Sequence, residues 1–274
     1  MELLPQSLLM SIVFCFGVAF GSFANVVIDR MNTGKSLNDR SRCFSCGRTL
    51  MWYELVPLVS FLALKGRCYN CRANIPTRFF LVELLSGALF VWASWVFGVG
   101  IEFLLAATLL LILIIICVYD LRHYIIPDRL SLLVAVLAVV IVSARAWPDL
   151  WQINLLWTFL SGILGFAAYG SLWVISKGRW IGLGDAKLAF GLGLLVGLHL
   201  LFSFVVLSFW LGALISLSVI ALRQGTTSLG LTLPRLTMKS EVPFAPFMIA
   251  AFLLTYLGHV DVLVLTYHVI SSLF

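Results

Sequence analysis

Long apolar runs recur from one end of the chain to the other, and they limit the possible folds more than any other feature. Each run is close to the roughly 20 residues that a helix needs to cross the hydrocarbon core of a bilayer. Composition agrees, because 62% of the residues are hydrophobic and only 11% are charged, whereas soluble domains carry about 25% charged residues. Backbone polar groups must be satisfied internally in lipid, and helices do this within one segment. We therefore expect an all-α polytopic membrane protein.

About eight spans account for the apolar runs. The run over 186–222 is long enough for two short helices with a turn near His199. The alternative, one tilted span, would place the basic residues of 223–242 on the opposite side, so charge favours two spans. The expected spans are 7–28, 79–98, 101–119, 130–147, 150–176, 186–200, 202–222 and 243–268.

The basic residues indicate how the spans are oriented. All of the 18 lysines and arginines except Arg145 lie in or beside four loops, 29–78, 120–129, 177–187 and 223–242. Loops rich in Lys and Arg face the cytoplasm under the positive-inside rule. This distribution predicts a multi-pass membrane protein with both termini outside.

Two other interpretations of the amino end and the charge are disfavoured. The first apolar run follows Glu2 with no basic residue before it, and it is too long for the core of a cleaved signal peptide. The net charge of +6 could suggest nucleic-acid binding. Because the basic residues lie in loops between spans and no soluble basic domain carries them, we expect the lipid bilayer as a partner and no nucleic acid.

The loop between the first two spans contains two C-x2-C pairs, Cys43 with Cys46 and Cys68 with Cys71. Each pair can offer two thiolates, and two pairs complete a four-cysteine zinc site. Disulfides or redox motifs are the alternatives, but disulfides do not persist in the cytoplasm. Four thiolates leave no open coordination position, so the spacing predicts a structural zinc ion.

The segment 52–63 between the cysteine pairs is apolar but too short to span a membrane. It is also interrupted by Glu54 and Pro57. An interfacial or re-entrant segment against the cytoplasmic leaflet fits these features better than a span. The predicted organisation is a first transmembrane helix (1–28), a cytoplasmic zinc-binding loop (29–78) and a seven-helix membrane domain (79–274).

Two aspartates lie at the edges of apolar runs. Asp120 closes one run, and Asp185, within Gly182-Leu183-Gly184-Asp185, opens another. Ionisable residues at span edges are costly and mark functional sites by default. An alternative is that each aspartate caps a helix end or pairs with a nearby basic residue, Arg122 or Lys187. Paired carboxylates at one membrane edge indicate acid–base chemistry in which the two groups share a proton.

A third acid, Asp128, lies near Asp120 in the sequence. It follows Pro127 and fits an ordinary N-cap.

Two other classes of protein are alternatives to an enzyme. A proton-coupled transporter would also use paired carboxylates, but it would place them near the midplane, often within repeats. A zinc-loop receptor without chemistry would leave the two aspartates unexplained.

Several short segments along nearly the whole chain match one family together. They are residues 21–30, both cysteine pairs, Trp52-Tyr53-Glu54-Leu55-Val56-Pro57, residues 78–87, residues 120–128, residues 182–188 and Val242-Pro243-Phe244-Ala245-Pro246-Phe247. In this combination the chain resembles the type IV prepilin peptidases, membrane aspartic proteases of the GxGD kind. Phe44 replaces the usual Pro of the first cysteine pair, and Ala245 replaces a common Gly.

The resemblance implies a bifunctional enzyme with catalytic aspartates at Asp120 and Asp185, facing the cytoplasm. Such enzymes remove the short basic leader of type IV prepilins and pseudopilins after Gly. They then methylate the new amino terminus with S-adenosylmethionine. A peptidase without methyltransferase activity is the narrower alternative.

The position of the methyl donor is less constrained. No complete dinucleotide-binding or P-loop motif is present, so the donor site is expected in the zinc loop and the cytoplasmic span ends. Trp52, Tyr53 and Glu54 are candidates for one wall of this site, and Glu54 could offset the sulfonium charge. An exposed loop acid is the alternative role for Glu54.

Overall fold

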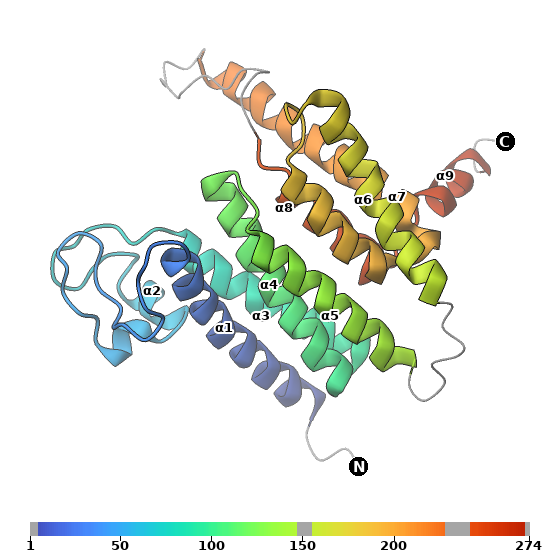
Figure 1. Cartoon of the computed structure of the whole chain (residues 1–274). Coiled ribbons are helices and arrows are strands. Elements are labelled where there is room, and N and C mark those ends of the chain that lie inside the picture. The colour runs from blue at the N-terminus through green and yellow to red at the C-terminus, as the bar shows by residue number, and fades with distance from the viewer. Residues whose placement is uncertain (1–4, 147–154, 228–241, 272–274) are drawn as a thin grey trace. The chain divides into compact units, whose positions relative to one another are not determined.

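The structure is a computed structural model that describes residues 5–146, 155–227 and 242–271 (Figure 1). Helices make up nearly all of its regular structure, and within these ranges there is no β-strand, only two isolated bridges in the first loop. The helices are α1 (Gln6–Arg30), η1 (Trp52–Leu55, a 3-10 helix), α2 (Val59–Ala63), α3 (Arg78–Phe97), α4 (Ile101–His123), α5 (Asp128–Ala146), α6 (Leu155–Ser176), α7 (Leu183–Thr227), α8 (Ala245–Tyr256) and α9 (Val262–Ser271). The predicted all-α fold is confirmed.

Five helices of the described residues are long and apolar enough to cross a membrane: α1, α3, α4, α6 and α7. The fifth of these, α7, covers two of the predicted short spans. Its backbone leaves the helical region at Gly197, where φ is 73°. Glycine adopts this left-handed conformation without steric cost, and the break lies two residues before His199. The expected turn near His199 therefore corresponds to this kink.

The expected continuous span over 243–268 is instead two helices. The α8 helix ends at Tyr256, and α9 begins at Val262. The Gly258 N–H donates a hydrogen bond to the Leu253 carbonyl at 3.1 Å, a bond that spans five residues and is typical of a helix end. His259 then takes a left-handed φ of 51° in the connection between the two helices. Gly258, His259 and Asp261 interrupt the apolar sequence at this break, a signal that the predicted continuous span did not take into account.

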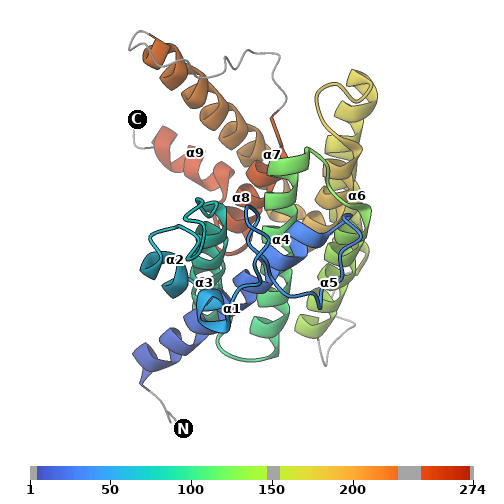
Figure 2. The same ribbon diagram turned by 90° about the vertical axis from the view of Figure 1, so that its left-hand side faces the viewer.

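The chain divides into two compact units, residues 1–115 and 116–274. In the first unit α1 packs along α3, as Figures 1 and 2 show. Glycines permit this contact, because a Cβ atom on Gly17 would lie 2.8 Å from the Ser86 carbonyl oxygen, and one on Gly87 would lie 2.6 Å from the Phe14 ring. Small residues let membrane helices approach in this way. The three-part organisation predicted from the sequence remains a prediction.

In the second unit α7 packs against α5, α6 and α8 (Figure 1). Tyr169 of α6, Phe204 of α7 and Phe252 of α8 are among the largest fully buried side chains. The α6–α7 contact is also polar, since the Ser161 hydroxyl donates to the Gly193 carbonyl at 2.8 Å. This packing fixes the start of α7, where Asp185 lies.

Candidate active site and metal centre

Asp120 lies in the last turns of α4 and is only 4% exposed. Its Oδ2 atom accepts a hydrogen bond from the backbone N–H of Ala245 at 3.1 Å. Ala245 is the first residue of α8, which has no side-chain cap from its own N-cap residue, Phe244. The first N–H groups of a helix have no partner inside the helix and attract negative charge. Asp120 therefore caps α8 from another helix.

Asp185 lies in the first turn of α7 and is 7% exposed. Its Oδ2 accepts the backbone N–H of Gly182 at 3.1 Å. Both glycines around it are closely approached: a Cβ on Gly182 would lie 3.2 Å from Asp185 Oδ2, and one on Gly184 would lie 3.1 Å from Ile126 Cβ, both tighter than ordinary van der Waals contact. The Gly-x-Gly-Asp sequence thus holds the carboxylate against the backbone and lets the segment after α4 pack beside it.

The two aspartates belong to the same compact unit and lie within electrostatic reach of each other. The hydrogen bond recorded for each carboxylate comes from a backbone N–H and not from a basic side chain. Lys187, the basic residue nearest to Asp185 in sequence, pairs instead with Asp128 at 2.7 Å. The alternative of an Asp185–Lys187 pair therefore does not describe this site.

Asp128 itself differs from the expected N-cap. It is the first residue of α5, so Pro127 occupies the position before the helix, and the Pro127 carbonyl accepts the N–H groups of Leu130 and Ser131. The Asp128 carboxylate is left to pair with Lys187 across to α7. Because both side chains are well exposed, this pair contributes little to stability.

Tyr169 is a nearby polar residue that the sequence did not single out. It is fully buried on α6, its hydroxyl and that of Ser208 are 2.7 Å apart, and it lies within electrostatic reach of Asp185. Its ring stacks on Phe209 with centroids 5.7 Å apart. A tyrosine inside an apolar run was the only available signal, and it is a weak one because tyrosines are common in membrane helices.

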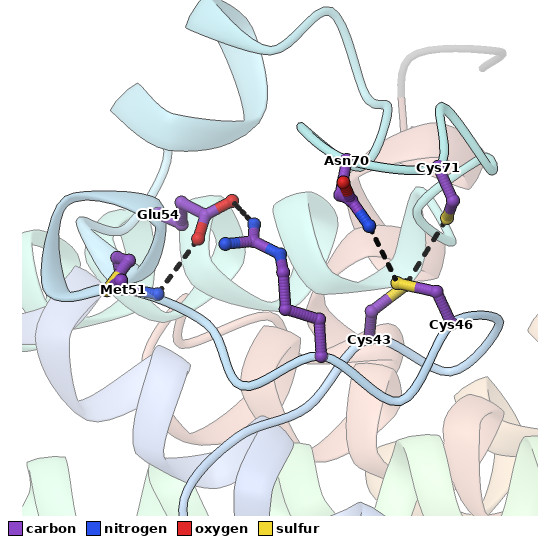
Figure 3. A network of polar contacts seen from close by, with 7 residues as sticks. Cys43, Cys46, Met51, Glu54, Asn70 and Cys71 are labelled. Carbon is purple, nitrogen blue, oxygen red and sulfur yellow. Dashed lines mark hydrogen bonds and ion pairs between the residues drawn. The ribbon is translucent and has the colours of Figure 1, made fainter.

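The four cysteines come together in the loop between α1 and α3. Their sulfur atoms all lie within 4.8 Å of one another. The sulfurs of Cys43 and Cys71 are 3.8 Å apart and point toward each other in Figure 3. Tetrahedral zinc with Zn–S bonds of about 2.3 Å requires sulfur–sulfur separations of about 3.8 Å. The arrangement fits a tetrahedral metal ion.

The two cysteine pairs have the same local structure. In the first, the Cys43 N–H donates to the Arg48 carbonyl at 2.9 Å, and in the second the Cys68 N–H donates to the Ala73 carbonyl at 2.9 Å. A left-handed residue follows the second cysteine in both, Gly47 with φ 69° and Arg72 with φ 60°. The loop therefore contains two copies of one knuckle.

The backbone of the second knuckle favours a thiolate. N–H groups of Cys71 and Asn70 that point at the Cys68 sulfur lower the pKa of Cys68 to about 6. The pKa of Cys46 is also lowered, mainly by the Arg48 N–H. Thiolates are the form of cysteine that binds metals. Each knuckle thus contains one cysteine whose thiolate, the metal-binding form, is stabilised by backbone N–H groups.

The three loop residues considered for the methyl donor differ in environment. Glu54 is 8% exposed, whereas Trp52 is 79% and Tyr53 48% exposed. Glu54 accepts the Met51 N–H at 2.8 Å and pairs with Arg48 at 2.5 Å (Figure 3). Glu54 lines a cavity of about 750 Å³ between this loop, α1 and α3, and the two aromatic residues do not. Of the three candidates, only Glu54 is therefore buried at the cavity, whereas the rings of Trp52 and Tyr53 are exposed outside it.

Glu83 is a cavity residue that the sequence analysis did not identify as functional. It lies in α3, is 8% exposed, and its Oε2 accepts the Leu58 N–H at 2.8 Å. A glutamate inside an apolar run is a signal for function. The signal was present, but nothing in the sequence showed that the loop folds back over this position.

Comparison with known proteins places these features in one family. The model described as "Type IV leader peptidase family" matches residues 107–217, and the one described as "Bacterial Peptidase A24 N-terminal domain" matches residues 15–97. The first match contains both Asp120 and Asp185. The second contains all four cysteines and Glu83. No solved structure matches the chain.

Three relatives share the printed name "Prepilin leader peptidase/N-methyltransferase". The protein from Bacillus subtilis (strain 168) is 32% identical over 251 residues, which cover 91% of this chain and 94% of the relative. The protein from Klebsiella pneumoniae is 34% identical over 208 residues, 68% of this chain and 85% of the relative. The protein from Myxococcus xanthus (strain DK1622) is 36% identical over 187 residues, 66% of this chain, and the match spans about half of that relative, 54%. With both family models matching and a relative aligned over almost its full length, the chain belongs to the type IV leader peptidase family.

Proposed function

We propose that this protein is a membrane aspartic peptidase that cleaves the leader of type IV prepilins and pseudopilins and then methylates the new amino terminus. One observation carries the peptidase part. Two buried carboxylates, Asp120 and Asp185, lie within electrostatic reach of each other inside the region that matches the leader peptidase family.

In this proposal the two aspartates share the acid–base work of peptide hydrolysis. The ionised carboxylate takes a proton from water, and the protonated one polarises the scissile carbonyl and later gives a proton to the departing nitrogen. The recorded backbone bond falls on Oδ2 in both residues, which leaves each Oδ1 for water or substrate. Two like charges close together in a buried site favour the singly protonated pair.

The cysteine cluster is proposed to hold one zinc ion through Cys43, Cys46, Cys68 and Cys71. Four thiolates fill a tetrahedral shell, so the ion would stabilise the loop and take no part in the reaction. The short sulfur–sulfur separation and the N–H groups around Cys68 support this assignment.

The methyl donor is proposed to be S-adenosylmethionine, as the printed names of the relatives suggest. The new amino group must be neutral to attack the methyl carbon, and a free α-amino group has a pKa near 7.7–8.0. A modest desolvation would then be enough to produce the reactive form at neutral pH.

The proposed location is the bacterial inner membrane, with the cysteine loop and the two aspartates at the cytoplasmic face and both termini outside. The distribution of basic residues supports this orientation. Apolar side chains of η1 and α2, among them Trp52, Val59 and Leu62, are exposed, which suits an interfacial segment beside the cytoplasmic leaflet.

Incubation of the purified protein with a prepilin and S-adenosylmethionine in lipid nanodiscs tests the proposal. Mass spectrometry should show loss of the leader and one added methyl group on the mature pilin. Asp120→Asn and Asp185→Asn should each reduce cleavage by roughly 10²-fold or more, whereas Asp128→Asn, which removes only an exposed ion pair, serves as the matched control.

Near-normal cleavage by either variant would refute the aspartate assignment. A native protein that cleaves fully but adds no methyl group would be a peptidase only. Proton flux in proteoliposomes without any cleavage would favour the transporter alternative.

A further inference from the structure

The cavity beneath the cysteine loop has the size of a small-molecule site. Its volume is about 750 Å³, and its walls come from the loop and from residues of α1 and α3. Drug-sized ligands occupy pockets of about 300–1,000 Å³ that are mostly apolar with a few placed polar groups.

Glu83 supplies a buried negative charge without a recorded cation beside it. Two other acids that line the cavity have basic partners: Glu54 pairs with Arg48, and Asp29 pairs with Arg78 at 2.6 Å. For Glu83 the described residues supply only uncharged partners, the N–H of Leu58 on Oε2 and the side chain of Ser22. A buried carboxylate that lacks an opposite charge is costly. A positively charged ligand would compensate it.

The backbone that binds Glu83 is also unusual. Leu58 has φ 60° and ψ −50°, a conformation that a bulky residue rarely adopts. Such backbone strain persists only where surrounding contacts impose it. Here the bond from the Leu58 N–H fixes the carboxylate at the cavity wall.

Asn25 supplies an unused hydrogen-bond acceptor. It lines the cavity from α1 and is 2% exposed. Its Nδ2 donates to the Phe79 carbonyl at 3.1 Å, whereas its Oδ1 is buried with no hydrogen-bond partner. Buried polar atoms of folded proteins are nearly always satisfied. An N–H group of a bound ligand would satisfy this oxygen.

Aromatic rings and basic side chains complete the lining. Phe44 with Phe79 and Phe61 with Phe80 form two ring pairs, with centroids 5.9 Å and 5.3 Å apart. Such faces suit a planar purine base. Four basic residues also line the cavity and can attract a carboxylate: Arg30, Lys35, Arg40 and Arg42.

We propose that this cavity binds S-adenosylmethionine with its sulfonium against Glu83 and an N–H donor against Asn25 Oδ1. This assignment rests on the methyl transfer proposed above and names its donor site. A sulfonium has no hydrogen to donate, so a carboxylate in an apolar wall recognises it by charge alone. The hydrogen-bonding amino group or adenine amine is then left for Asn25.

The reaction at this site balances without any further reagent. The lone pair of the neutral pilin amine forms the new N–C bond, and the C–S bond breaks with its electron pair remaining on sulfur. The products are S-adenosylhomocysteine, a neutral thioether, and a methylammonium that releases its proton to solvent. Glu83 thus faces a positive charge that disappears during the reaction, which favours departure of the product.

The charge difference between donor and product gives a direct test. Affinities of the zinc-loaded protein in nanodiscs for S-adenosylmethionine and for S-adenosylhomocysteine are measured by isothermal titration calorimetry. Glu83→Gln removes the charge and keeps the shape, so donor affinity should fall by about thirty-fold or more. Product affinity should change by less than about threefold, because the thioether carries no charge at sulfur.

Control variants separate this role from a structural one. Glu102→Gln makes the same change at an exposed position on α4 outside the cavity and should leave both affinities unchanged. Glu83→Asp, which retains the charge, should recover part of the donor affinity. Prepilin cleavage is measured in every variant, and it should continue in Glu83→Gln, which shows that the protein remains folded.

The outcomes are distinct. Equal losses of donor and product affinity, or no loss of either, would overturn the placement of the sulfonium at Glu83. Donor binding and methylation that survive both Glu83→Gln and Asn25→Leu would move the donor site elsewhere. A native protein that cleaves but neither binds the donor nor methylates would instead refute the proposed methyltransferase function.

Discussion

Replacing Gly21 with alanine should disturb both the packing of the first unit and the donor cavity. A Cβ at this position would lie 2.7 Å from Ser86 Oγ and 2.9 Å from Glu83 Cα. Carbon atoms pack best at about 3.5–4.0 Å, so α1 would have to move away from α3 by roughly 0.6 Å or more. Overpacking of this kind typically costs about 1–3 kcal/mol.

The displacement would act directly on the cavity. Ser22 and Asn25, which follow Gly21 on α1, line the same cavity as Glu83 on α3. Widening it separates the proposed sulfonium and N–H sites, so Gly21→Ala should weaken S-adenosylmethionine binding as well as stability. The melting temperature in detergent should fall by roughly 2–10 °C, as a cost of this size implies for a chain of this length.

Gly100→Ala is the matched control, because a Cβ there would meet no atom within 4 Å. Thermal unfolding followed by circular dichroism, together with donor titration, measures both effects. Equal melting temperatures and equal donor affinities for Gly21→Ala and the native protein would refute the close packing of α1 on α3.

Three further outcomes are expected. Chelating the zinc, or replacing Cys71 with serine, should reduce methylation of the pilin more than cleavage of its leader. Mass spectrometry of the mature pilin measures both, and equal losses of the two activities would contradict a link between the loop and the donor. Arg72→Gly should stabilise the metal-loaded loop by about 1 kcal/mol, because glycine adopts the left-handed backbone without steric cost; a less stable variant in chelator titrations would argue against that strain. The Ser203 hydroxyl holds the pKa of Asp261 below its usual range, so this bond stabilises the fold above the unfolded pKa of about 3.9 and is lost as the pH falls through the lower folded value. Asp261→Asn should therefore flatten the fall of stability below about pH 4 in thermal scans, and an unchanged pH profile would refute it.

Features set by local sequence could be predicted. The spacing within each cysteine pair predicts a knuckle because a short turn alone brings the two sulfurs together. A turn in α7 was expected near His199 because a single tilted span would have placed the basic residues of 223–242 on the opposite side of the membrane. The edge positions of Asp120 and Asp185 were likewise visible from where charge interrupts apolar sequence, although their catalytic role remains a prediction.

Features set by contacts between distant segments could not. The bond from the Leu58 N–H to Glu83 and the bond from Asn25 to the Phe79 carbonyl join residues that lie far apart in sequence. The capping of α8 by Asp120 joins α4 to a helix more than a hundred residues later. No periodicity or motif records such contacts. The division between α8 and α9 was missed for another reason: Gly258, His259 and Asp261 interrupt the apolar sequence there, but the run was long enough to be taken as one span.

The cysteine cluster and the cavity share residues, since Cys43 and Cys68 belong to both. Cobalt(II) accepts the same tetrahedral sulfur ligands as zinc, and unlike zinc its partly filled d shell absorbs visible light. A cobalt-loaded protein would therefore carry a chromophore in the cavity wall. Any compound that enters and moves either thiolate would shift the absorption bands, so occupancy of the cavity could be followed by colour in real time, in intact membranes and without labelling the ligand.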